Sequence, residues 1–243
     1  MIGFERRAVG LLWLVAAVVG GVTSSVDAGE TINLFDGKSL AGWSAKEPVA
    51  RSKWTVAAAQ LDSKDATRLA LSTPAASDGA LVNDAQPKPT KETRGVDIFS
   101  QRKFGDCTIE LEFMVPQGSN SGVYVMGEYE IQIKDSYGEE KLTYQGLGAI
   151  YKVATARVNA ARKPGQWQSM RIEFIAPRFE GGKKVANARI VKIVLNDQVI
   201  HEDVELTDVT PGGLTGKKMA AGPLMFQGDH GPVAYRNIRV TLP

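Results

Sequence analysis

The residues around His230 are typical of a functional site. It lies in Gly228-Asp-His-Gly-Pro232, a glycine-flanked loop between two expected strands. An imidazole is a natural general base or acid near neutral pH. Beside Asp229 it could also ligate a divalent metal ion, and the cofactor question stays open on this pattern. A histidine that only caps a loop by bonding to backbone carbonyls would look the same. His201, on an expected outer strand, has the setting of a surface residue.

Carboxylates and amides recur on two segments with a strand-like period. In residues 108–115 and 129–134, apolar residues alternate with polar ones, and Glu112 and Glu130 belong to the polar set. This period of two predicts strands with one buried face. If the two strands share a sheet, their polar side chains line up on the face away from the core. A solvated outer face of an antiparallel sheet would give the same pattern without any function.

Ion pairing is the other structural explanation for these carboxylates. Glu112 and Glu130 could each pair with Arg171 or Arg236 across the sheet. This explanation and a catalytic role are equally compatible with the sequence.

Short antiparallel strands are the elements that must position these groups. Turn signals are closely spaced, Glu180-Gly-Gly-Lys183 is typical of a hairpin turn, and no helical period of useful length follows residue 28. These features predict an all-β chain folded as an antiparallel sandwich or barrel. Strands are expected at residues 108–115, 129–134, 169–175, 188–195, 198–204, 223–227 and 233–242.

Residues 57–95 are poor in large apolar side chains. They predict two or three short strands and a long surface excursion, with an irregular loop at Gln86-Pro-Lys-Pro-Thr90. Trp43 and Trp54 are expected in the core, because tryptophan buries a large area.

The N-terminal 28 residues have the order of regions found in a secretory signal. Arg6 and Arg7 precede an apolar run over residues 8–22, and Val26-Asp27-Ala28 offers a cleavage site after Ala28. The run is too short for a membrane span, and an uncleaved anchor is the alternative. We therefore expect an exported protein, periplasmic or extracellular, with no stable membrane span after cleavage and a single domain over residues 29–243.

Charge and cysteine usage exclude several classes of protein. The chain has 29 Lys and Arg against 27 Asp and Glu, and its basic residues do not cluster with aromatic ones, which disfavours nucleic-acid binding. Cys107 is the only cysteine and is expected to be a small buried thiol. Zinc-ligand spacings, phosphate-binding glycine loops and GxSxG elbows are absent from the sequence.

Eight fragments in a fixed order carry a family resemblance over most of the chain. They are Phe35-Asp-Gly-Lys-Ser-Leu-Ala-Gly-Trp43, Phe104-Gly-Asp106, Glu112-Phe113, Asn120-Ser-Gly-Val-Tyr124, Tyr129-Glu-Ile-Gln-Ile133 with Asp135, Gly148-Ala-Ile-Tyr151, Pro164-Gly-Gln-Trp167, and Gly222-Pro-Leu with Gln227, His230-Gly-Pro-Val and Arg236-Asn-Ile238. From about residue 31 to its end, the chain resembles the 3-keto-disaccharide hydrolase-like family. Two features depart from the family pattern: Lys134, where an aliphatic residue is usual, and the Pro- and Lys-rich excursion at 85–94.

The resemblance implies a fold, a substrate class and a set of site residues. The implied fold is a concanavalin A-like jelly roll of two antiparallel sheets, and the implied substrates are oligosaccharides or glycosides oxidised to a ketone at C3. The matching stretches offer Glu112, Glu130, Asp135 and His230 as catalytic candidates. Candidates for binding the sugar are Asn120, Tyr124, Gln132, Tyr151, Trp167, Gln227 and Arg236. Asn120 could instead be only a turn former, and Trp167 a rim or core residue.

The chemistry of a 3-keto sugar defines what the site must contain. The ketone acidifies the hydrogen on C2, a base can remove it, and the glycosidic oxygen on C1 can then leave before water adds. Such a reaction needs a base, a group that stabilises the enolate and an acid for the leaving group. The alternative is a non-catalytic carbohydrate-binding or adhesion module. An ordinary glycosidase is less favoured, because no strand carries an E-x-D-x-E pattern.

Overall fold

A computed structural model describes residues 1–3, 29–75 and 79–243. The expected signal segment falls almost wholly outside the described residues. Within them, no helix has the length and apolar character needed to cross a membrane. The described secondary structure is β apart from one 3-10 turn, η1 (Val49–Arg51).

The larger of the two main sheets has nine strands, all paired antiparallel. Strand β16 lies in the middle of this sheet. It pairs with β7 along one edge, and along its other edge its first residues pair with β5 and its last residues with β1. The order is β14 (Gln198–Leu206), β13 (Ala188–Leu195), β10 (Gln168–Ile175), β7 (Cys107–Met114), β16 (Val233–Thr241), β5 (Ala80–Asn83), β3 (Trp54–Leu61) and β4 (Leu69–Ser72), with β1 (Thr31–Asn33) on β16.

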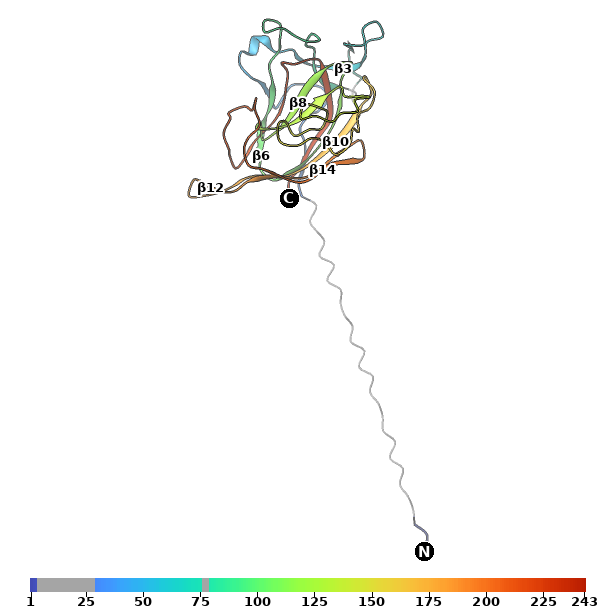
Figure 1. The fold of residues 1–243 in the computed structure, drawn as a ribbon, viewed down its shortest axis with the longest axis vertical. Helices are drawn as coiled ribbons and strands as arrows, with labels where there is room; N and C mark the ends of the chain where they lie inside the picture. The colour runs from blue at the N-terminus through green and yellow to red at the C-terminus, as the bar shows by residue number, and fades with distance from the viewer. Residues whose placement is uncertain (4–28, 76–78) are drawn as a thin grey trace.

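The second sheet has five strands and packs against the first. Its order is β2 (Trp43–Ala45), β6 (Ile98–Phe104), β15 (Gly222–Phe226), β8 (Asn120–Val125) and β9 (Tyr129–Lys134). A separate hairpin of β11 (Arg178–Glu180) and β12 (Lys183–Ala186) extends from the body of the molecule (Figure 1). Its turn, Gly181-Gly182, has positive φ at both residues, as a tight hairpin turn requires. The all-β jelly-roll sandwich expected from the sequence is confirmed.

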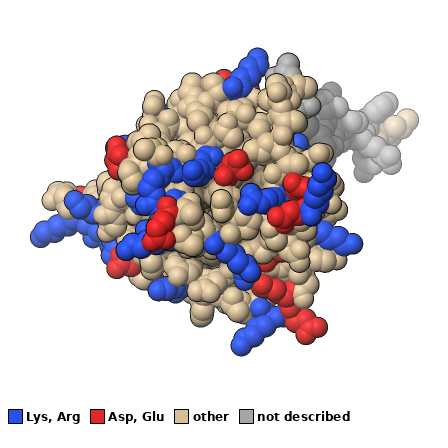
Figure 2. Space-filling model, turned by 90° about the horizontal axis from the view of Figure 1, so that it is seen from above, with Lys and Arg blue, Asp and Glu red and all other residues tan. Residues whose placement is uncertain are grey.

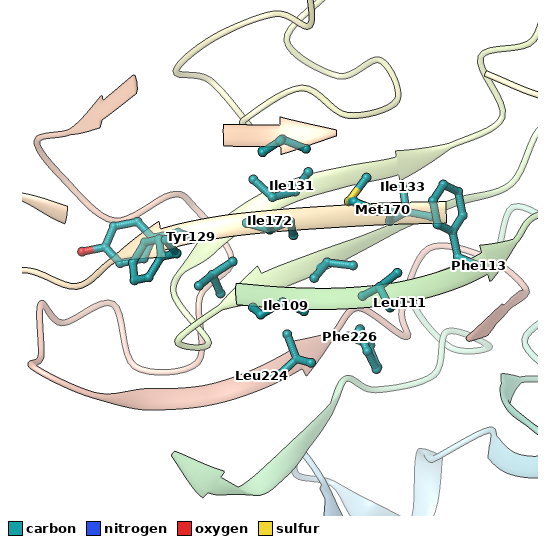
Figure 3. Packing of buried hydrophobic residues seen from close by; sticks show 14 of the residues in the cluster. Ile109, Leu111, Phe113, Tyr129, Ile131, Ile133, Met170, Ile172, Leu224 and Phe226 are labelled. Carbon is teal, nitrogen blue, oxygen red and sulfur yellow. The ribbon is translucent and has the colours of Figure 1, made fainter. Parts of the chain in front are cut away.

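The hydrophobic core lies between the two sheets. Apolar side chains of β7 and β10 face those of β9 and β15 across this layer (Figure 3). At one end, the rings of Phe226 and Tyr235 stack at 4.0 Å between centroids and join the two sheets. Trp43 and Trp54 pack beside them and are buried, as expected. Cys107 is also a buried thiol, and burial raises its pKa to about 12.

The strands appear close to their expected positions, but the condition under which two polar rows would line up is not met. The polar rows containing Glu112 and Glu130 do not share a sheet, because β7 belongs to the nine-stranded sheet and β9 to the five-stranded sheet. The segment after β7 crosses from one sheet to the other. Glu112 and Glu130 therefore lie on opposite outer surfaces of the sandwich.

Candidate active site on the five-stranded sheet

A hollow of about 480 Å³ lies over the outer face of β8 and β9. Seven of the residues proposed from the sequence line it, drawn from these strands and from the loops that cover them. The lining residues are Asn120, Tyr124, Glu130, Gln132, Lys134, Gln145, Tyr151, Pro211, Gly212, Gln227 and His230.

The β8–β9 hairpin brings the polar side chains of this hollow together. Its register places Tyr124 opposite Glu130 and Gly122 opposite Gln132. The odd-numbered residues of β9 point into the core (Figure 3). Because side chains alternate along a strand, Glu130 and Gln132 point to the outer face. Strand alternation therefore builds the floor of the site.

Glu130 supplies the carboxyl group of the hollow, and its pKa is strongly raised. Only 2% of the residue is exposed. Burial raises the pKa of Glu130 to about 7, although the Tyr124 hydroxyl and the positive charge of His230 act in the opposite direction. Gly122 leaves the room for this carboxylate, since a Cβ there would lie 2.5 Å from Oε1 of Glu130.

Tyr124 lies beside Glu130 and keeps its phenolic proton. Burial, followed by the charge of Glu130, raises the pKa of Tyr124 far above its ordinary value. The hydroxyl lies 3.4 Å from the carbonyl oxygen of Pro211 and 3.4 Å from Nε2 of Gln227. Gly212 allows the close approach of this loop, because a Cβ there would lie 2.7 Å from the Tyr124 hydroxyl. The hydroxyl is thus a fixed neutral hydrogen-bond donor.

Three acceptor oxygens in the hollow are buried without a hydrogen-bond partner among the described residues. They are Oδ1 of Asn120, Oε1 of Glu130 and Oε1 of Gln227. Buried acceptors in folded proteins are nearly always paired. Three unpaired acceptors in one hollow therefore fit a ligand that brings several hydroxyl donors.

His230 lies at the rim, with an acidic partner next to it in sequence. Nδ1 of His230 and Oδ1 of Asp229 are 2.5 Å apart. The hydrogen bond to Asp229 raises the pKa of His230, so the protonated imidazolium persists to higher pH than in an isolated histidine. Half of the His230 side chain is exposed, which leaves Nε2 free to meet a ligand at the rim.

The loop that carries His230 is anchored by two buried polar side chains, one on β5 and one just before β6. Nδ2 of Asn83 donates to the carbonyl oxygens of Gly228 and Gly231, at 3.0 and 2.8 Å. The backbone N–H of Gly228 donates to Oδ1 of Asp97 at 3.0 Å. These bonds tie the loop that carries His230 to β5 and to the residue that precedes β6. Nothing in the sequence pattern pointed to Asn83 or Asp97.

A second loop is held in place by a buried carboxylate. Glu128 accepts hydrogen bonds from the N–H and the hydroxyl of Thr215 at 2.8 and 2.7 Å, and from the N–H of Gly216 at 2.9 Å. This loop includes Pro211 and Gly212, which line the hollow. Glu128 therefore positions one wall of the site, a role that its sequence context did not suggest.

Comparison with known proteins gives the site a family context. Residues 30–241 match the model of the 3-keto-alpha-glucoside-1,2-lyase-like domain. The chain belongs to this family. A 3-keto-disaccharide hydrolase of Bacteroides thetaiotaomicron is 29% identical over 132 residues. That match covers 53% of this chain and 38% of the relative, so this chain spans well under half of the relative's length.

Solved structures from Parabacteroides distasonis ATCC 8503 share the fold of this family member. One candidate glycosyl hydrolase is 28% identical with a TM-score of 0.65, and the alignment covers 88% of this chain and 84% of that one. A second is 20% identical with a TM-score of 0.55, covering 88% and 100% of the two chains, and shows the fold alone. The resemblance found in the sequence is confirmed.

Three residues proposed for the site lie at the nine-stranded sheet of this family member, two on its strands and one just before β10. Nε of Arg236 donates to Oε2 of Glu112 at 2.7 Å, as a cross-strand pair between β16 and β7. The Arg236 guanidinium lies 4.0 Å from the centre of the Trp167 ring. The ion-pair explanation therefore holds for Glu112, whereas Glu130 has no such arginine among the described ion pairs. Glu112, Trp167 and Arg236 do not contribute to the hollow.

Asp135 has a turn-forming position. Its carboxylate accepts hydrogen bonds from the N–H of Gly118 at 2.8 Å and of Tyr137 at 3.3 Å. It does not line the hollow, but it supports the turn next to it. Its neighbour Lys134 does line the hollow and pairs with Glu139 at 3.0 Å.

The expectation that His201 is a surface residue is wrong. It is 2% exposed, and its Nε2 lies 2.9 Å from the carbonyl oxygen of Gly148. A bulge in the β13–β14 ladder lies between the partners of His201 and Val199, so Ile200 and His201 both turn inward. His201 thus supports the loop that carries Tyr151.

A metal site receives no support from the described residues. They contain no cluster of three or more His, Cys, Asp or Glu with the geometry of a metal centre.

Proposed function

We propose that this protein cleaves 3-keto glycosides by removing the proton on C2, eliminating the group on C1 and then adding water. The single observation that carries the proposal is a buried Glu130 of near-neutral pKa, placed among unpaired acceptor oxygens and next to His230. Membership of the 3-keto-alpha-glucoside-1,2-lyase-like family supports the substrate class.

Glu130 would act as the base. A carboxylate with its pKa near 7 is a much stronger base than an exposed glutamate, and a base works best when its pKa lies near the working pH. Deprotonated Glu130 would take the C2 proton, and the C2–H electron pair would form the enolate of the C3 ketone. The Tyr124 hydroxyl keeps its proton and would donate a hydrogen bond to the enolate oxygen.

The leaving group would depart on the side of His230. As the enolate collapses, the C3 carbonyl re-forms, C1 and C2 become joined by a double bond and the C1–O bond breaks. Protonated His230, held by Asp229, would give its proton to the departing oxygen. Water would then add to C1 and give its proton to the now neutral His230. Glu130 would deliver its proton, by then exchanged with solvent, to C2, giving the free 3-keto sugar.

The remaining polar groups of the hollow would hold the sugar. Asn120 and Gln227 offer buried acceptor oxygens to its hydroxyl groups. Gln132 lies beside them on β9, and Tyr151 offers a ring face at the rim. We include in the proposal that residues 1–28 direct export, so that the enzyme works in the periplasm or outside the cell.

The test is release of the leaving sugar from a 3-keto disaccharide by wild type and two matched variants. Glu130→Gln should lower kcat by at least about a hundredfold, since it removes the base. Glu112→Gln makes the same change on the opposite sheet and should keep wild-type turnover. A wild-type protein that binds the disaccharide without releasing sugar would instead identify a carbohydrate-binding module.

A further inference from the structure

A second hollow, of about 460 Å³, meets the first at His230. It is formed mainly by the excursion at residues 85–94, which departs from the family pattern. Its lining is rich in cationic side chains: Lys88, Lys91 and Arg94, with Pro89, Thr90, Asp229 and His230 completing it. We call it the basic pocket.

The excursion has a defined conformation and not only a basic composition. The Arg51 guanidinium donates to the carbonyl oxygens of Lys91 at 2.8 Å and of Arg94 at 2.9 Å, which ties the excursion to η1. Within it, the N–H of Arg94 donates to the carbonyl oxygen of Thr90 at 2.9 Å, and the N–H of Thr90 donates to Oγ1 of Thr93 at 2.9 Å. These bonds hold the cationic side chains around one space.

The acidic groups near the basic pocket have hydrogen-bond or ion-pair partners, whereas its two lysines form no ion pair among the described residues. Asp229 lies 2.5 Å from His230 and 3.7 Å from Arg94. Glu92 accepts a hydrogen bond from the Thr90 hydroxyl at 2.8 Å. In the described part of the chain, the ion pairs include neither Lys88 nor Lys91.

This local excess of positive charge is not a property of the whole surface. The chain carries a formal charge of only +2. Figure 2 shows basic and acidic side chains interspersed over the face seen from above. A hollow whose cations outnumber its carboxylates therefore singles out one place where an anion is favoured.

We propose that the basic pocket receives the leaving group and selects one that carries a negative charge, such as the carboxylate of a uronic acid or a sulfate ester. This proposal rests on the proposed function, in which His230 protonates the departing oxygen. The leaving group must then lie on the side of His230 away from Glu130. His230 lines both hollows, so the space on that side of it is the basic pocket. The charge of the leaving group would meet Lys88 and Lys91.

The experiment compares three 3-keto disaccharides whose leaving sugars are glucose, glucuronate and glucose 6-sulfate. The readout is kcat/KM of each acidic substrate divided by kcat/KM of the glucose substrate, which cancels effects on the common chemistry. Wild type should prefer the charged substrates, and Lys88→Ser/Lys91→Ser should reduce that ratio by about threefold to tenfold. The control Lys103→Ser/Lys183→Ser removes two exposed lysines from β6 and β12 and should keep the wild-type ratio.

The outcomes separate this proposal from the proposed function. A ratio near one in wild type, or a ratio that the Lys88 and Lys91 substitutions leave unchanged, overturns the charge-selective pocket even if all three substrates are cleaved. If no 3-keto disaccharide is cleaved, the proposed function fails. The basic pocket is then tested by calorimetry with unoxidised disaccharides. The disaccharide that contains glucuronate must bind more tightly than the one that contains glucose, and this difference in affinity must disappear at high salt. Preference for only one of the two acidic substrates would show whether the pocket selects a carboxylate or a sulfate ester on the leaving group.

Discussion

Glu130 combines two properties that rarely occur together on an outer sheet face. It is almost fully buried, and it lacks an arginine or lysine partner among the described ion pairs. Glu112 has the same sequence pattern on β7, yet it pairs with Arg236 and stays partly exposed. The alternating pattern predicted both strands but could not separate the two carboxylates, because the difference comes from loops that cover one sheet face and not the other.

Burial of Glu130 should cost stability in a pH-dependent way. Its pKa is about 7 in the folded protein and ordinarily 4.5. Below pH 4.5 both states are protonated and there is no penalty. The penalty grows as pH rises to 7 and reaches about 3 kcal/mol. Glu130→Gln should therefore raise the free energy of unfolding in urea at pH 8 and change it little at pH 4.5. Equal effects at both pH values would contradict the assigned pKa.

The same two groups should shape the pH dependence of activity. We expect kcat/KM to rise through about pH 7 as Glu130 ionises, and to fall above the raised pKa of His230 as the acid is lost. His230→Gln should keep the rising limb and lose the falling one. A rising limb that persists in Glu130→Gln would exclude Glu130 as its source.

Gly122 should act through the position of Glu130. An added Cβ would lie 2.5 Å from Oε1, so Gly122→Ala must push the carboxylate aside. We expect kcat to fall by about a hundredfold with a small change in KM, because a base displaced by about 1 Å loses its alignment. The double variant Gly122→Ala/Glu130→Gln should be no slower than Glu130→Gln alone. Additive losses would show that Gly122 acts by another route.

At the scale of elements, the site is a strand hairpin covered by anchored loops. The strands were predictable, since alternation is a local signal that Ile131 and Ile133 display within one segment. The partners of each strand were not, because pairing joins residues far apart in sequence. The inward turn of His201 was hidden for the same reason, since the bulge exists only in the pairing of β13 with β14.

Glu128 should be the key anchor of the loop that forms one wall. Its buried carboxylate accepts hydrogen bonds from three donors of Thr215 and Gly216. Glu128→Ala should lower the free energy of unfolding by about 3 kcal/mol, because three hydrogen bonds to a buried carboxylate are lost. The loosened loop should also raise KM for a 3-keto disaccharide. Glu139→Ala, which removes a more exposed glutamate, is the control and should change stability little. A stable Glu128→Ala variant with an unchanged KM would contradict the anchoring role.

At the scale of the molecule, one end of the sandwich carries η1 and its neighbouring loops, while the β11–β12 hairpin extends from the other (Figure 1). The sequence predicted this sandwich through its turn signals and strand periods. It could not predict the hollow itself, since Pro211 and Gly212 are brought to the site by contacts of their loop with Tyr124 and Glu128, which lie far away in sequence.

Export is the expectation that belongs to the chain as a whole. Mass spectrometry of the protein isolated from its native cells should find an N-terminus at Gly29, after removal of residues 1–28. A chain that retains its first residues in the cytoplasmic fraction would contradict the proposal.

The most direct test of the central claim is to follow cleavage of a 3-keto disaccharide in D2O by NMR. Elimination breaks the C2–H bond, and the proton on Glu130 exchanges with solvent before water adds. The 3-keto sugar released by wild type should therefore carry deuterium at C2. Free 3-keto sugar kept in D2O without enzyme corrects for spontaneous exchange. Release and labelling should be lost together in Glu130→Gln and retained in Glu112→Gln. Sugar released with its original hydrogen at C2, from a substrate whose deuteration at C2 does not slow release, would show cleavage without proton abstraction and would contradict the account.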